Sequence, residues 1–151
     1  MQRNIRGFSS NREQIRILFN EYNLAAMCLQ ETKLGNDTPN LGNNFHFHRS
    51  PPLIGERAHG GTGIVVHKSV NFRAVQLNTV LQACAVQIFT TKWVTLCSLY
   101  LDPSLENRLK DVYGNPRQLE LCDLQTLIDQ LPKPFILMGD FNSNHIMLGE
   151  S

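Results

Sequence analysis

Apolar residues recur along the chain at helical spacing in two segments. The stretch "NREQIRILFNEYNL" has apolar residues at helical intervals, which predicts a helix that ends at Asn23. Ser10 and Glu13 have the spacing of a capping box, so Ser10 is predicted to cap this helix. The pattern in "PRQLELCDLQTLIDQL" predicts a second helix that begins near Pro116 and ends before Pro132.

Shorter apolar or alternating runs predict strands between and around these helices. The runs are "AAMCL", "FHFH", "IVVHKSV", "NFRAVQL", "ACAVQIF", "WVTLCSLY" and "FILMG". Short polar turns predict that the third and fourth runs form one hairpin and that the fifth and sixth form another. Strands interleaved with a few helices indicate a layered α/β or α+β fold, and the chain has no G-x-G-x-x-G dinucleotide-binding motif.

Size, charge and cysteine spacing narrow the class of protein. The 151 residues are enough for one domain or for part of a larger one, and a net charge of +1 neither favours nor excludes a polyanionic partner. The four cysteines are far apart and form no C-x-x-C pair. This spacing disfavours a disulfide framework and a zinc site, and predicts buried free thiols in a reducing compartment.

The chain has neither an apolar run of membrane-spanning length nor a secretory signal. No stretch approaches the length needed to cross a bilayer, and "MQRNIRGFSS" at the start has no apolar segment of the kind a signal peptide carries. We therefore expect an intracellular protein of the nucleus or cytoplasm that is not secreted and has no membrane partner.

Candidate chemistry lies where apolar runs end in polar residues. Asn4 stands at the end of a short first strand, and Glu31, Tyr100, Asp140 and Asn142 each stand at or just beyond the end of a strand named above. A rigid strand fixes such side chains while the loop leaves them open to substrate. Two carboxylates and an amide are hard oxygen ligands that suit Mg²⁺. Each residue alone also fits a turn or a solvated strand end, so the spacing leaves their convergence open.

Five motifs together resemble one known superfamily. "QRNIRGF", "LAAMCLQETKL", "GGTGIVVHKSV", "VTLCSLYLDPS" and "FILMGDFNSNH" occur in this order over essentially the whole chain. They resemble the endonuclease/exonuclease/phosphatase superfamily, and within it the apurinic-endonuclease-like domain of jockey-type non-LTR retrotransposons. The resemblance implies a four-layer α/β/β/α sandwich and Mg²⁺-dependent cleavage of a phosphodiester, with Mn²⁺ as an alternative cofactor. It implies DNA as the partner, nicked to prime reverse transcription.

The resemblance also assigns roles to individual residues. Glu31 resembles the main metal-binding carboxylate and Asn4 the residue that supports the metal site. Tyr100 resembles a phosphate-contacting tyrosine. Asp140 resembles the acid that positions water or protonates the leaving oxygen, and Asn142 resembles the amide that holds the scissile phosphate.

The chain departs from the family pattern in its histidines and at its ends. It has no Ser-Asp-His-like motif, and it stops soon after "GDFN". His145 does not replace that motif; it resembles a histidine that follows "GDFN" in the retrotransposon branch, with a weak claim to substrate binding. We therefore expect residues 1–151 to be a partial domain, truncated at its C-terminal side, with weak or no activity. A phosphatase of the same superfamily and a non-catalytic nucleic-acid-binding remnant are the alternatives.

Overall fold

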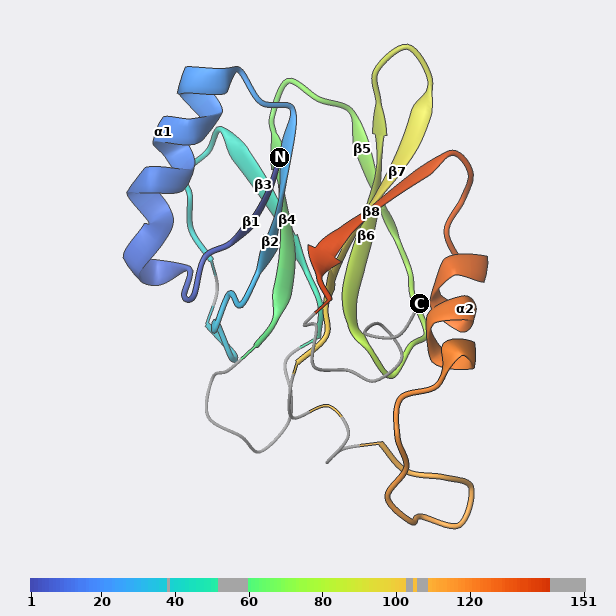
Figure 1. The fold of residues 1–151 in the computed structure, drawn as a ribbon. Coiled ribbons are helices and arrows are strands. Elements are labelled where there is room, and N and C mark those ends of the chain that lie inside the picture. Colours follow the sequence, from blue (N-terminus) through green and yellow to red (C-terminus); the bar gives the residue numbers. More distant parts are fainter. Residues whose placement is uncertain (38, 52–59, 103–104, 106–108, 142–151) are drawn as a thin grey trace.

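Two β-sheets lie face to face between two helices. The computed structural model describes residues 1–37, 39–51, 60–102, 105 and 109–141. Within these residues, eight strands form two four-stranded sheets. Figure 1 shows α1 on the outer face of one sheet and α2 on the outer face of the other. The predicted four-layer α/β/β/α sandwich is therefore confirmed.

The first sheet has the strand order β1-β2-β4-β3. Strand β1 runs parallel to β2, whereas β4 is antiparallel to both of its neighbours. The strands are β1 (Gln2–Asn4), β2 (Ala26–Gln30), β3 (Phe45–Arg49) and β4 (Thr62–His67).

The second sheet has the order β5-β6-β7-β8. Strands β6 and β7 form the predicted hairpin, and β8 runs parallel to β7 at the edge. The strands are β5 (Phe72–Val75), β6 (Gln82–Phe89), β7 (Trp93–Tyr100) and β8 (Phe135–Asp140).

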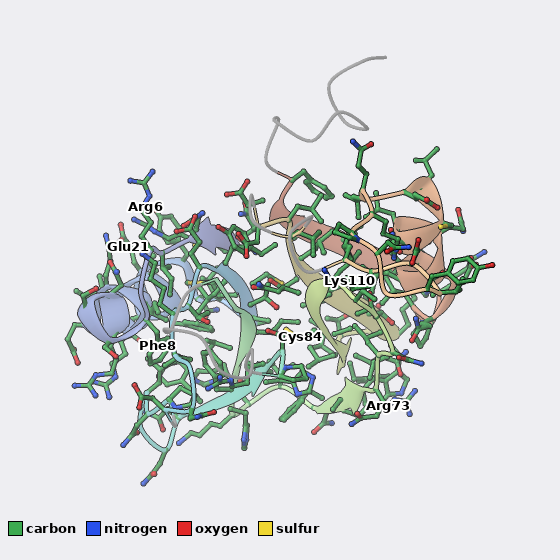
Figure 2. All side chains as sticks on the ribbon, turned by 90° about the horizontal axis from the view of Figure 1, so that it is seen from below. Arg6, Phe8, Glu21, Arg73, Cys84 and Lys110 are labelled. Carbon is green, nitrogen blue, oxygen red and sulfur yellow. The ribbon has the colours of Figure 1, made fainter. Side chains whose placement is uncertain are left out.

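Alternation along the strands produces separate apolar layers. In β2, Met27 and Leu29 pack against α1, while Ala26 and Cys28 face the second sheet. Successive strand residues point to opposite faces, so one buried strand serves two cores. Cys84 lies in the layer between the sheets, as the end-on view in Figure 2 shows. A third core joins α2 to the outer face of the second sheet.

The prediction of buried free thiols is confirmed for three of the four cysteines. All four are free; three are buried and Cys122 is exposed. Burial raises the pKa of the Cys84 and Cys97 thiols to about 12, and it raises the pKa of Cys28 as well. These thiols stay protonated and act as small apolar core groups.

Among the described residues, no helix is long and apolar enough to cross a bilayer.

The hairpin predicted for "IVVHKSV" and "NFRAVQL" is wrong. The two segments become β4 and β5, which belong to different sheets. Strand β4 has β2 on one side and β3 on the other, so neither of its edges is left for β5. Strand β5 pairs with β6 instead.

Both helices differ from the predictions at their first residues. Helix α1 spans Arg12–Tyr22 and ends, as predicted, at Asn23 in the left-handed conformation. Ser10 does not cap it, because Ser10 lies inside a preceding 3₁₀ turn, η1 (Ser9–Asn11).

Helix α2 spans Leu121–Asp129 and begins five positions later than predicted. The reason is that Pro116 forms an antiparallel bridge with Lys110. The capping residues are Glu120 and Asp123, and Asp123 accepts the backbone N–H of Glu120 at 2.9 Å.

Candidate active site

The two parallel strand pairs bring four predicted site residues to one edge of the sandwich. Asn4 ends β1 in register with Gln30, the residue before Glu31. Tyr100 ends β7 in register with Asp140, the last residue of β8. Edge strands β1 and β8 contact each other across the sandwich. The polar groups at the ends of four separate strands therefore meet at a single place.

Asn4 joins the two carboxylates of this cluster. Its Nδ2 donates to Oε1 of Glu31 at 2.8 Å and to Oδ2 of Asp140 at 2.9 Å. Hydrogen bonds to charged acceptors are stronger than neutral ones. Because Asn4 and Asp140 belong to different sheets, the amide also links the sheets at the site.

Glu31 projects from a left-handed backbone. Its φ is 54°, and Arg6 and Lys33 nearby have φ values of 49° and 51°. Such conformations cost about 1–3 kcal/mol for a residue other than glycine and cluster at functional sites. The Arg6 N–H donates to Oδ1 of Asn4 at 3.2 Å, which turns the Asn4 Nδ2 toward the carboxylates.

Tyr100 is a buried phenol beside these acids. Burial raises its pKa first; the negative charges of Glu31, Asp102 and Asp140 and a hydrogen bond to Glu31 raise it further. The hydroxyl is therefore protonated well above neutral pH. It is a hydrogen-bond donor at the site, and the three surrounding acids make this a place that favours cations.

A polar chain lies behind Glu31 and is buried at Gln30 and Ser98. Gln2 Nε2 donates to Oε1 of Gln30 at 2.5 Å, Gln30 Nε2 donates to Ser98 Oγ at 3.0 Å, and that hydroxyl donates to the Leu29 carbonyl at 3.0 Å. Ser98 went unpredicted, although a serine inside the apolar run "VTLCSLY" was a usable signal. Satisfied buried networks of this kind rigidify a site.

Gly139 leaves no room for a side chain before Asp140. A Cβ at this position would lie 2.1 Å from the carbonyl oxygen of Leu99 on the paired strand. The glycine of "MGD" thus lets β8 approach β7 closely where Asp140 meets Tyr100.

The residues present fit a divalent cation of the Mg²⁺ type. Among the described residues, no three His, Cys, Asp or Glu side chains form a group that could hold a metal ion. Mg²⁺ does not need such a cage, because it is commonly held by one or two carboxylates, with water and substrate phosphate completing the shell. The carboxylates of Glu31 and Asp140 can supply these oxygen ligands, and the Asn4 Nδ2, which donates to both, holds them side by side.

Two of the predicted site residues, Asn142 and His145, lie outside the described residues. Their predicted contacts with phosphate and substrate therefore stay predictions, as do the roles assigned to the four residues that come together.

Sequence comparison places the chain in a known family. Residues 2–148 match the Endonuclease/Exonuclease/phosphatase family, and the chain belongs to it. Among curated protein sequences, none matches the chain significantly.

Solved structures share the fold at low sequence identity. The endonuclease domain of TRAS1, a telomere-specific non-LTR retrotransposon, has a TM-score of 0.62 at 18% identity, over 92% of this chain and 56% of that chain. The 3′ phosphatase NExo from Neisseria, bound to a product DNA hairpin, has a TM-score of 0.59 at 17% identity, over 93% and 56%. The human Nocturnin catalytic domain has a TM-score of 0.52 at 20% identity, over 91% and 59%. The chain thus spans a little over half the length of these structures.

Proposed function

We propose that this chain is a Mg²⁺-dependent DNA endonuclease domain of the non-LTR retrotransposon type, which nicks one strand to leave a 3′ hydroxyl that primes reverse transcription. The observation that carries the proposal is the bridge of Asn4 between Glu31 and Asp140, beside a protonated Tyr100. The likeness to the TRAS1 endonuclease domain and to a Neisseria enzyme bound to DNA supports DNA as the substrate.

In the proposed mechanism, each residue at a strand end has a separate role. Glu31, supported by Asn4 and Asp140, would hold Mg²⁺ or Mn²⁺, which when bound polarises the phosphoryl group and offsets charge on the leaving oxygen. Tyr100 donates a hydrogen bond to a phosphate oxygen. Asp140 orients the attacking water or protonates the leaving oxygen. Asn142 holds the scissile phosphate, and His145 is a further substrate contact.

The assay must be able to register slow turnover. Residues 1–151 contain no Ser-Asp-His motif, so the proposed mechanism assigns no role to that histidine. A positioned general acid or base typically contributes about 10²–10⁴-fold in rate. The proposed activity should therefore be sought with protein in excess over DNA and with long incubations.

Nicking of supercoiled plasmid tests the proposal. Wild type should slowly convert supercoiled to open-circular DNA in Mg²⁺, and a chelator should stop the conversion. Glu31→Gln should abolish it. The matched control Glu13→Gln changes an exposed acid that pairs with Arg16 on α1 and should nick like wild type.

Two outcomes would overturn the proposed function. Nicking that persists in Glu31→Gln, or without a divalent ion, would place the activity elsewhere. Release of inorganic phosphate from a 3′-phosphorylated oligonucleotide without any nicking would favour a phosphatase. Extension of the nick by a DNA polymerase checks the free 3′ hydroxyl separately.

A further inference from the structure

Gln82 is a buried polar residue that the proposed mechanism does not use. It is the first residue of β6, is 5% exposed and lies in register with Tyr100. A buried amide is stable only when its polar atoms find partners. The hydrogen-bond partners of the Gln82 amide therefore indicate which part of the structure it stabilises.

The Gln82 amide holds a glycine loop of the first sheet. Its Oε1 accepts the backbone N–H of Gly61 at 2.5 Å, and its Nε2 lies 3.5 Å from Oδ2 of the buried Asp102. Gln82 therefore connects the loop before β4 to the segment that follows Tyr100. This contact spans the two sheets next to the site.

The glycine loop in turn holds the backbone beyond Glu31. Thr32 N–H donates to the Gly61 carbonyl at 3.2 Å, and Lys33 N–H donates to the Gly60 carbonyl at 2.9 Å. Both glycines have positive φ, at 60° and 86°.

A side chain at either glycine would displace a polar side chain that packs against the loop. A Cβ at Gly60 would lie 2.6 Å from Gln82 Oε1, and one at Gly61 would lie 2.6 Å from Thr32 Oγ1. The loop thus fits closely between Gln82 on one side and the turn after Glu31 on the other.

We infer that Gln82 is a positioning residue, which keeps Glu31 in its left-handed, metal-facing conformation by anchoring the Gly60–Gly61 loop. Glu31 has a φ of 54°, and Lys33, two residues on, has a φ of 51°, so this turn needs outside support. The loop supplies two backbone acceptors, and Gln82 fixes the loop. The metal-binding part of this inference rests on the proposed function; the anchoring part does not.

The decisive variant is Gln82→Met, which keeps the length of the side chain and removes both polar atoms. Amide hydrogen exchange of Thr32 and Lys33, measured without metal, should accelerate because the loop that accepts their N–H groups is released. Mn²⁺ affinity, measured by electron paramagnetic resonance, should weaken by about 10- to 100-fold, the range seen when groups that orient metal ligands are removed.

Two further variants separate positioning from general stability. Gln87→Met is the matched control, because Gln87 is another buried glutamine of β6, 8% exposed, whose Oε1 accepts from Arg73 Nε at 2.7 Å. It should leave the Thr32 and Lys33 exchange rates and the Mn²⁺ affinity unchanged. Gln82→Glu keeps an acceptor for the Gly61 N–H, but it also places a second carboxyl against Asp102. It should therefore retain the amide protection that Gln82→Met loses when exchange is measured at acidic pH, where the introduced carboxyl is protonated and does not repel Asp102.

The results test the anchoring of the loop by Gln82 and the effect of Gln82 on metal binding separately. Unchanged exchange of Thr32 and Lys33 in Gln82→Met overturns the positioning role. Exchange in Gln82→Glu at acidic pH that is as fast as in Gln82→Met overturns it as well. If Gln82→Met changes exchange but Mn²⁺ binds as in wild type, the link to the metal is overturned. If wild type itself binds no Mn²⁺, the proposed function fails while the exchange comparison still tests the anchor.

Discussion

Replacing Asn4 by aspartate should destabilise the protein through the site alone. The two side chains have nearly the same shape, so packing is preserved. The variant removes a donor that two carboxylates share, at 2.8 and 2.9 Å, and puts a third carboxylate between them. The cost therefore has an electrostatic origin that the structure specifies.

The size of the expected loss in free energy of unfolding follows from the charge of the two acceptors and from their exposure. A hydrogen bond to a charged group contributes about 1.5–3 kcal/mol. Because Asn4, Glu31 and Asp140 are only half-buried, the lower end applies, and two such bonds amount to ~3 kcal/mol. The added negative charge increases this loss in free energy of unfolding.

Urea unfolding with and without millimolar Mg²⁺ measures the effect. The control is Asn11→Asp, which removes two part-buried hydrogen bonds to the neutral carbonyls of Ile5 and Gly7 and an exposed one to the Ser10 hydroxyl that water can replace. Neutral bonds contribute about 1 kcal/mol each, so this control should lose at most ~2 kcal/mol. Mg²⁺ should recover part of the Asn4→Asp deficit, because a third carboxylate between Glu31 and Asp140 makes the folded variant bind the cation more tightly than wild type does. It should not change the Asn11→Asp deficit, because that variant and wild type bind Mg²⁺ equally. An Asn4→Asp deficit no larger than that of Asn11→Asp, with no response to Mg²⁺, would refute the reasoning.

Three further predictions concern stability. The pKa values of the three buried thiols are raised, so the folded state keeps protons that the unfolded state releases above a pKa of 9.0. Under reducing conditions the free energy of unfolding should therefore be constant below that pH and fall as pH rises toward 12, by up to ~1.4 kcal/mol per pH unit for each thiol. The fall should be less steep in Cys84→Ala, which has one buried thiol fewer. Hydrogen bonds from Arg117, at 2.8 Å to each carboxylate oxygen, lower the pKa of Asp123. The contribution of Asp123 to the free energy of unfolding should therefore be present above pH 3.8 and be lost on further acidification. Asp123→Asn should lack this loss when stability is measured as a function of acidic pH. Gly139→Ala should unfold the protein or lower its melting temperature severely. A Cβ at Gly114 would meet nothing within 4 Å, so Gly114→Ala should cost only about 1–2 kcal/mol, for its positive φ.

Most of the fold could be predicted because local patterns carry it. The helix ending at Asn23, the hairpin of β6 and β7 and the terminal strand β8 follow from periodicity and turn residues. The partner of β5 could not be predicted, because the free edge it joins is made by β6, later in the chain, while the edges of β4 are filled by β2 and β3. Similarly, α2 begins late because a bridge from Lys110 occupies Pro116.

The four candidate residues that come together could be named from the sequence, but the residues that support them could not. Asn4, Glu31, Tyr100 and Asp140 each stand at a strand end, and parallel pairing brings those ends together. Gln82 had no local signal, because its function depends on a glycine loop twenty-one residues earlier and in the other sheet. Long-range polar contacts of this kind become visible only when the sheets are placed.

The most direct test of the central claim is to find where Mn²⁺ binds. In nuclear magnetic resonance spectra of the whole chain, substoichiometric Mn²⁺ should selectively broaden the backbone amides around Asn4 and Glu31 in the first sheet and around Tyr100 and Asp140 in the second. Glu31→Gln should remove that broadening from both sheets together. Broadening confined to one sheet, or broadening that Glu31→Gln leaves unchanged, would contradict a single metal site built from the four strand ends.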